Sequence, residues 1–189
     1  MKTIIVFHSV CGNTYLLAKA FYNSLVKQKK DVKIFRVLDP DLEDIKNIFP
    51  IANELYNEIV NIPIVTPEDI LDCENIILGC PTYFGNVSAE MKAFMDSTAI
   101  FWTEARLAGK KLTAFTTTGT AEGGGGLCLQ SINTFGLHMG MIPTPIPSTL
   151  NSQINLPAYG FIHYTGDNSD VRPTEHLYSA IENYTKTVL

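Results

Sequence analysis

The chain has 189 residues, of which 46% are hydrophobic and 17% are charged. This composition is typical of a globular protein with a sizeable core and not of a disordered chain. The net charge of -5 leaves no excess of cations for a phosphate backbone, which argues against a general nucleic-acid binder. The sequence has no run of about 20 apolar residues, so we expect no membrane insertion.

The N-terminal residues and the cysteines indicate the compartment. The stretch MKTIIVFHS has only a short apolar run, which ends at His8, and we interpret it as a first strand and not as a secretory signal. The four cysteines, at positions 11, 73, 80 and 128, are widely separated. This spacing predicts neither a zinc site nor a disulfide framework. We therefore expect no metal site and a cytoplasmic location.

Short apolar runs alternate along the chain with segments of helical periodicity. TIIVF at 3–7 and NIILGC at 75–80 are typical of strands that are buried on both faces. We predict strands at 3–7, 32–37, 75–80 and 111–117, a fifth strand split between 141–147 and 160–164, and helices that begin at Asn13, Ser88, about Leu127 and Pro173. Prolines interrupt residues 39–72 into short helical pieces such as 52–60, and the role of this segment stays open.

Alternating strands and helices predict one domain over residues 1–189, with a parallel sheet and helices on both faces. Such sheets bind ligands beyond the carboxyl ends of their strands. Three polar or glycine-rich loops, at 8–14, 81–87 and 117–126, follow the first, third and fourth predicted strands. We expect these loops to meet at one edge of the sheet.

The first of these loops, SVCGNT at 9–14, precedes a predicted helix whose N-terminal N–H groups favour a phosphate. It matches neither a Walker pattern nor a dinucleotide-binding glycine pattern. Leu17 occupies the position where a phosphatase loop beginning at Cys11 would need arginine. A neutral, hydroxyl-rich loop remains, which suits holding a phosphate better than cleaving one. A helix cap without a ligand is the alternative.

The other two loops suit a flat ring. CPTYFGN at 80–86 places two aromatic residues after a buried strand, and TTTGTAEGGGG at 116–126 is rich in glycine. Aromatic rings can cover a planar ligand while backbone amides bind its polar edge, and glycines let the backbone lie close against it. Together the three loops predict a slot for a planar, phosphorylated ligand.

Four motifs in this order resemble a known family. They are S-V-C-G-N-T at 9–14, P-T-Y-F-G-N at 81–86, T-T-G-T at 117–120 and L-H-M-G-M at 137–141. They resemble flavodoxin-like FMN proteins, and most closely the WrbA-type NAD(P)H:quinone oxidoreductases; G-D-N-S at 166–169 is similar to a late loop of that branch. The resemblance implies a three-layer α/β fold with a doubly wound, parallel, five-stranded sheet in the order 2-1-3-4-5, which binds FMN.

The resemblance also implies roles for individual residues. The FMN phosphate would be held by Ser9, Gly12, Asn13 and Thr14, with backbone N–H groups from Val10 and Cys11. The isoalloxazine ring would be bordered by Pro81, Thr82, Tyr83, Phe84, Gly85 and Asn86. The ring edge or the ribityl chain would be touched by Thr117, Thr118, Gly119 and Gly124.

Two further residues correspond to positions near the flavin in that branch. His138 would lie beside the flavin, facing the acceptor together with Tyr83, and Trp102 would reach the site of a neighbouring subunit in a tetramer. Tyr83 stands where the family often has arginine, which could pair with the phosphates of a nicotinamide cofactor as tyrosine cannot.

The implied activity is the two-electron reduction of a quinone-like acceptor by NAD(P)H, in a homodimer or homotetramer. The main alternative is a flavodoxin-type electron carrier that has no small-molecule substrate. A flavodoxin-fold interaction protein without a ligand is a second alternative. An iron–sulfur flavoprotein would need a compact cysteine cluster, which the sequence lacks.

Overall fold

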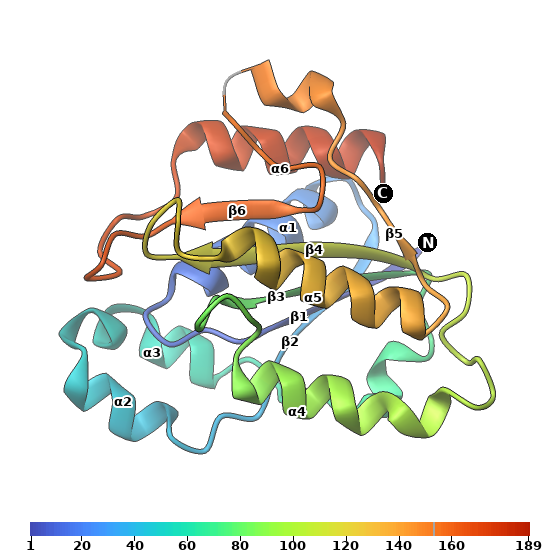
Figure 1. Ribbon diagram of the computed structural model, residues 1–189, viewed down its shortest axis with the longest axis horizontal. Helices are drawn as coiled ribbons and strands as arrows, with labels where there is room; N and C mark the ends of the chain where they lie inside the picture. The colour runs from blue at the N-terminus through green and yellow to red at the C-terminus, as the bar shows by residue number, and fades with distance from the viewer. Residues whose placement is uncertain (153) are drawn as a thin grey trace.

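The computed structural model describes residues 1–152 and 154–189. Their strands form one parallel sheet in the order β2-β1-β3-β4-β5, with β6 also paired to β4 (Figure 1). The strands are β1 (Lys2–Phe7), β2 (Asp31–Arg36), β3 (Asn75–Pro81), β4 (Lys111–Thr118), β5 (Ile142–Pro143) and β6 (Phe161–Tyr164). The predicted flavodoxin-like sheet order is confirmed.

The fifth position of the sheet is shared by two short strands. β5 pairs with the start of β4, where Lys111 lies opposite Ile142. β6 pairs with the end of β4, where Thr118 lies opposite Tyr164. The segment that follows β5 is rich in proline, and proline has no N–H to donate to a strand ladder. The sheet position is therefore interrupted, as the sequence predicts.

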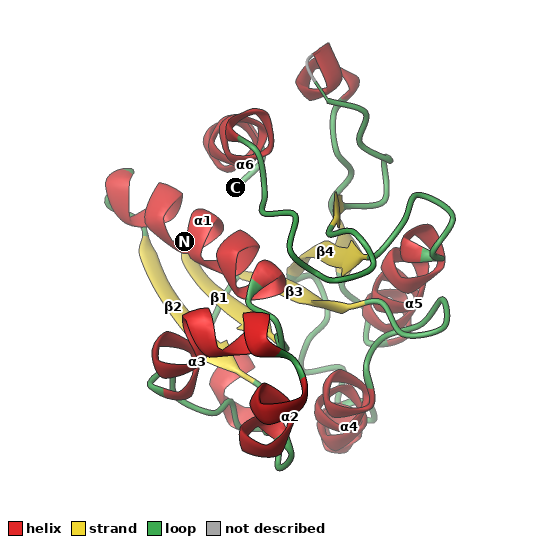
Figure 2. Cartoon of the chain, turned by 90° about the vertical axis from the view of Figure 1, so that its left-hand side faces the viewer, coloured by secondary structure: helices red, strands yellow, loops and turns green. Residues whose placement is uncertain are grey.

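Helices cover both faces of the sheet (Figure 2). α1 (Asn13–Lys27) and α6 (Glu175–Thr187) lie on one face, and α4 (Ala89–Ser97) and α5 (Gly125–His138) lie on the other. The predicted cap of α4 is confirmed, because Ser88 Oγ accepts a hydrogen bond from Met91 N at 3.3 Å. None of the helices in the described ranges is long and apolar enough to cross a membrane.

The ambiguous segment at 39–72 folds mostly into helix. It contains α2 (Leu42–Ile48), the 3₁₀ turn η1 (Pro50–Ala52), α3 (Asn53–Val60) and a second 3₁₀ turn, η2 (Pro67–Ile70). Figure 2 shows α2 and α3 at the end of the sheet where β1 and β2 terminate. The remaining 3₁₀ turns are η3 (Thr98–Phe101) and η4 (Ser148–Ser152).

A cluster of aromatic rings fixes α1 and α6 to the sheet. The ring of Phe161 meets those of Phe21 and Tyr184 edge to face, at centroid distances of 5.2 and 5.1 Å. Tyr184 is fully buried, and its hydroxyl lies 2.7 Å from Thr144 Oγ1 and 3.0 Å from Thr113 Oγ1. A buried phenol needs such partners, so this face of the core specifies where α6 lies.

Candidate functional site

The three loops meet around one cavity of about 240 Å³ at the carboxyl edge of the sheet. Parallel strands place all their carboxyl ends at one edge, which is why segments so distant in the sequence come together. A fourth loop, after β6, completes the wall. The cavity is lined by Ser9, Val10, Cys11, Asn13, Thr14, Pro81, Thr82, Tyr83, Thr117, Thr118, Gly119, Thr165, Gly166, Asp167 and Ser169.

The first loop presents unpaired hydrogen-bond donors. The bonds of α1 begin with Leu16 N to the Gly12 carbonyl at 2.9 Å. Among the described residues, no protein acceptor lies within bonding distance of the backbone N–H groups at 10–15. Ser9 Oγ is also buried without a partner. Buried donors normally have partners, so this arrangement fits a bound phosphate better than an unliganded helix cap.

Two side chains of the loop are already engaged with neighbouring loops. Thr14 Oγ1 lies 2.8 Å from Thr117 Oγ1, and Asn13 Nδ2 donates to the Ser169 carbonyl at 2.7 Å. These bonds tie the first loop to the end of β4 and to the loop after β6. One N–H of the Asn13 amide therefore helps to shape the loop.

Gly12 has a structural role that the sequence does not reveal. Its φ is +90°, and a Cβ added there would lie 2.6 Å from Leu55 Cδ1 on α3. The resemblance places Gly12 among the residues that would hold the phosphate. Instead α3 packs against the outer side of the loop, and Gly12 does not line the cavity.

The second loop divides between the cavity and a neighbouring groove. Tyr83 lines the cavity and is 43% exposed, and the partial burial of its phenol, followed by the nearby Cys11, Glu90 and Asp39, raises its pKa to about 12. It is therefore a neutral hydrogen-bond donor at physiological pH. Phe84 is fully exposed.

Gly85 and Asn86 line a separate groove between α4 and α5. Gly124 has φ +81°, and its missing Cβ would lie 2.7 Å from the Cα of Gly85. The glycine run thus packs against the second loop, and Gly124 does not line the cavity.

A network of hydroxyls and thiols lies behind the cavity wall. Thr82 Oγ1 is 2.8 Å from Thr116 Oγ1, which also donates to the Cys80 carbonyl at 2.7 Å. Cys80 Sγ and Cys128 Sγ are 3.8 Å apart and fully buried. Both cysteines thus serve as small, buried side chains of the core. The network positions Thr82 at the cavity.

His138 and Trp102 lie away from this cavity. α5 begins beside the cavity at Gly125 and ends at His138, so its 14 residues carry His138 about 20 Å along the helix axis. Trp102 follows η3 at the same far edge of the sheet, where its Nε1 donates to the His138 carbonyl at 3.0 Å. Figure 1 shows α5 running back from the carboxyl ends of the strands. We expected His138 and Tyr83 to face the acceptor together at the carboxyl edge of the sheet. Within one subunit this expectation is wrong, because the helix that follows a parallel strand runs antiparallel to that strand and ends at the opposite edge.

His8 forms a buried cluster next to the loop at 9–14. Its Nε2 lies 3.0 Å from Asp39 Oδ2, and its Nδ1 lies 2.9 Å from Ser88 Oγ and 3.5 Å from Glu90 Oε2. The ligand atoms of His8, Asp39 and Glu90 lie within 4.8 Å of one another. Both ring nitrogens are engaged, with the two carboxylates at different nitrogens, so we assign the cluster to the packing of β1 against α4 and not to a metal.

Hydrogen bonds and nearby positive charges lower the pKa of the Asp39 carboxyl group. Burial alone would raise it, but the hydrogen bond and charge of His8, the backbone N–H of Asp41 and the charge of Arg36 together bring it below its usual value. Asp39 is therefore an ionised, buried acceptor for His8.

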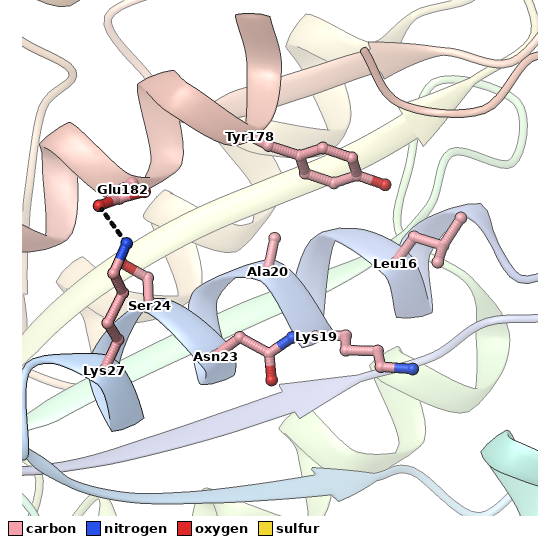
Figure 3. A pocket seen from close by; sticks show the side chains of 8 residues that line it. All are labelled: Leu16, Lys19, Ala20, Asn23, Ser24, Lys27, Tyr178 and Glu182. Carbon is pink, nitrogen blue, oxygen red and sulfur yellow. Dashed lines mark hydrogen bonds and ion pairs between the residues drawn. The ribbon is translucent and has the colours of Figure 1, made fainter. Parts of the chain in front are cut away.

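A second hollow lies between α1 and α6, on the face of the sheet away from α5 (Figure 3). Figure 3 shows Lys27 of α1 reaching Glu182 of α6, and their charged atoms are 3.2 Å apart. Lys19 is paired with Glu58 at 2.6 Å. Both lysines of this hollow are thus already neutralised by carboxylates, and we assign no ligand to it.

The fold and the cavity define a flavodoxin-like protein with a loop of unpaired N–H donors at the carboxyl edge of its sheet. The family model described as NADPH-dependent FMN reductase matches residues 1–154. The chain belongs to this family, and FMN is its cofactor.

Individual relatives agree with this assignment. The chain is 39% identical over 101 residues to a Paracoccus denitrificans protein named NAD(P)H dehydrogenase (quinone), and this match covers 53% of the chain and 49% of that relative. It is 30% identical over 157 residues to NAD(P)H dehydrogenase (quinone) 3 of Rhizobium meliloti, covering 82% of the chain and 71% of the relative. The chain thus spans about half of the length of the first relative and 71% of the length of the second.

A solved structure supports the fold. The crystal structure of a flavodoxin, WrbA-like protein from Agrobacterium tumefaciens aligns with a TM-score of 0.64 at 18% identity, covering 98% of this chain and 93% of that one. At this identity the likeness establishes the fold alone.

Proposed function

We propose that the protein is an FMN-dependent oxidoreductase that transfers two electrons from NAD(P)H to a quinone-like acceptor. The observation that carries this proposal is the loop at 9–14, whose unpaired N–H groups and orphaned Ser9 hydroxyl face a cavity at the N-terminus of α1. A dianionic phosphate satisfies these donors. The family membership and the names of the relatives supply the reaction class.

FMN, when bound, supplies the redox chemistry, and the chain binds and orients it. Residues 9–14 would hold the phosphate through backbone N–H groups and Ser9 Oγ. Thr117, Thr118 and Gly119 would lie along the sugar chain or the ring edge, because they line the same cavity. Pro81, Thr82 and Tyr83 would border the ring, with the neutral phenol of Tyr83 available as a donor.

His138 and Trp102 would contribute to a neighbouring subunit. Trp102, Leu137 and Ile100 are exposed apolar side chains at the end of the molecule that also carries His138, and exposed apolar surface favours assembly. We propose a homodimer or homotetramer in which His138 of one subunit faces the acceptor side of another. We also propose a cytoplasmic location, since the described cysteines are all free thiols.

Two measurements test this function. FMN added to apo-protein at micromolar concentration should lose its fluorescence, and the absence of any change would contradict FMN binding at this site. The loaded protein should then oxidise NADH or NADPH in the steady state when benzoquinone is present. A protein that binds FMN but shows no quinone-dependent oxidation with either donor would instead be an electron carrier.

A further inference from the structure

Arg172 contacts the phosphate loop from its outer side. It lies between β6 and α6, and its Nη1 donates to the Cys11 carbonyl at 2.8 Å and to Asn13 Oδ1 at 3.2 Å. Its Nη2 lies 2.6 Å from Glu54 Oε2 on α3. Arg172 does not line the cavity, so its contacts are with the loop that would hold the phosphate.

These hydrogen bonds determine which way the loop faces. A trans peptide unit is planar, so its C=O and N–H point in opposite directions. A guanidinium that holds the Cys11 carbonyl outward therefore turns the Gly12 N–H inward, toward the side where Cys11 and Asn13 line the cavity. Arg172 and the Ser169 carbonyl also bind the two ends of the Asn13 amide. The side chain of Asn13 is thereby held in one orientation.

Arg172 also places a cation beside the loop, where Glu54 at 2.6 Å balances its charge. Residues 9–14 contain no lysine or arginine, whereas a phosphomonoester carries a charge of about -1.5 to -2 at pH 7. In the described ranges, Arg172 is the basic side chain that is hydrogen-bonded to this loop. Lys19, on the next turn of α1, is paired with Glu58 at 2.6 Å.

The segment between β2 and β3 supports this arrangement. Glu54 of α3 binds the guanidinium, and Leu55 packs against Gly12 at the outer side of the loop. Glu58, one turn further, accepts hydrogen bonds from Tyr15 at 2.9 Å and from Lys19. α3 therefore backs both the loop and the arginine that holds it.

We propose that Arg172 is a positioning residue for FMN, which holds the loop at 9–14 with its N–H groups facing the phosphate. This inference rests on the proposed placement of the phosphate on residues 9–14. In this arrangement α3 holds Arg172 in place through Glu54. It also predicts a specific signature, because the contribution of Arg172 depends on the phosphate and not on the flavin ring.

The experiment compares FMN with riboflavin, which lacks the phosphate, by fluorescence titration of apo-protein. We expect Arg172→Gln to weaken FMN binding about 10- to 30-fold, as for the loss of hydrogen bonds to a charged group, and to change riboflavin binding less than about twofold. Arg172→Lys keeps the charge but not the planar fork, so we expect it to weaken FMN binding about three- to tenfold. Lys27→Gln, at the C-terminal end of α1 and in an ion pair with Glu182, is the matched control and should leave both affinities within about twofold of wild type.

Several outcomes would overturn the inference. These are equal FMN affinities for wild type and Arg172→Gln, or an equal loss of FMN and riboflavin, which would indicate general damage. Thermal unfolding of each apo-variant checks the fold, and if Arg172→Gln does not fold, the FMN-to-riboflavin ratio of Arg172→Lys decides. Failure of the wild-type protein to bind FMN would contradict the proposed function itself, so the two failures are distinguishable.

Discussion

Thr14 Oγ1 lies 2.8 Å from Thr117 Oγ1, across 103 positions of the chain. Both side chains are buried, and both line the cavity. The bond joins the first turn of α1 to the end of β4, so the phosphate end and the sugar end of the proposed FMN site are mechanically linked. A substitution at Thr14 should therefore weaken the contacts with more than one part of the cofactor.

Replacing Thr14 with valine should weaken FMN binding about tenfold. The substitution removes a hydroxyl from the cavity and leaves Thr117 Oγ1 without this partner. We expect this to reduce the free energy of FMN binding by about 1–2 kcal/mol. Cys11→Ser should change the affinity less than about twofold, because Cys11 is proposed to act through its backbone. Fluorescence titration of the two apo-variants with FMN measures the difference, and equal losses would argue against the proposed register of the loop.

Replacing Gly12 with alanine should destabilise the apo-protein. Alanine at a φ of +90° costs about 1–2 kcal/mol, and its Cβ would lie 2.6 Å from Leu55 Cδ1. In the background of Leu55→Ala most of the steric part should disappear, because only the Leu55 Cβ, at 3.2 Å, would remain close, while the backbone part remains. A double-mutant cycle by urea unfolding measures this coupling. Additive effects would show that α3 does not press on the loop.

Asp39→Asn should lower the stability of the apo-protein in a pH-dependent way. The pKa of Asp39 is lowered in the folded state despite its burial, so its contribution is present above the unfolded pKa of about 4 and is lost as pH falls through the folded value. We expect the free energy of unfolding to fall by about 1–2 kcal/mol at pH 7. This difference should become smaller below about pH 4. Asp72→Asn, at an exposed ion pair with Lys2, is the control. A pH-independent difference would contradict the linkage.

Cys11 should react slowly with iodoacetamide and be protected by FMN. Burial raises the pKa of its thiol, against the opposing effects of Ser169 and Arg172, so alkylation should still be increasing above pH 9. The other three cysteines are buried and should react only on unfolding. Peptide mass spectrometry follows each site, and riboflavin should protect Cys11 less than FMN does. Undiminished labelling with saturating FMN would place the cofactor elsewhere.

His138→Ala should lower quinone reduction by pre-reduced protein about 10- to 100-fold, as for loss of a general acid. FMN affinity should stay unchanged, because His138 lies far from the cavity of its own subunit. Stopped-flow kinetics measures the first quantity, and light scattering across a concentration series establishes whether the protein is an oligomer. A monomeric mass together with a wild-type rate would leave His138 and Trp102 as structural residues.

The order of elements and the location of the binding loops could be predicted from the sequence, because they depend on local pattern. A β-branched apolar run such as 3–7 is compatible with a strand buried on both faces, and parallel strands bring their following loops to one edge. The G-D-N-S motif at 166–169 is recognisable by its resemblance alone. Its place in the cavity wall is not predictable from the sequence, because a polar turn after a short strand has no distinctive local signal.

The contacts that shape the site depend on tertiary structure. The bond between Arg172 and the Cys11 carbonyl joins residues 161 positions apart, and no periodicity relates them. Leu55 meets Gly12 because α3 lies over the carboxyl edge, a placement that the proline-interrupted segment at 39–72 did not predict. The sequence therefore determined which residues form the strands, the helices and the polar loop at 9–14. Only the packing of distant elements decided that α3 and Arg172 hold that loop, and that His138 lies at the opposite edge of the sheet, since such contacts depend on three-dimensional proximity and not on local pattern.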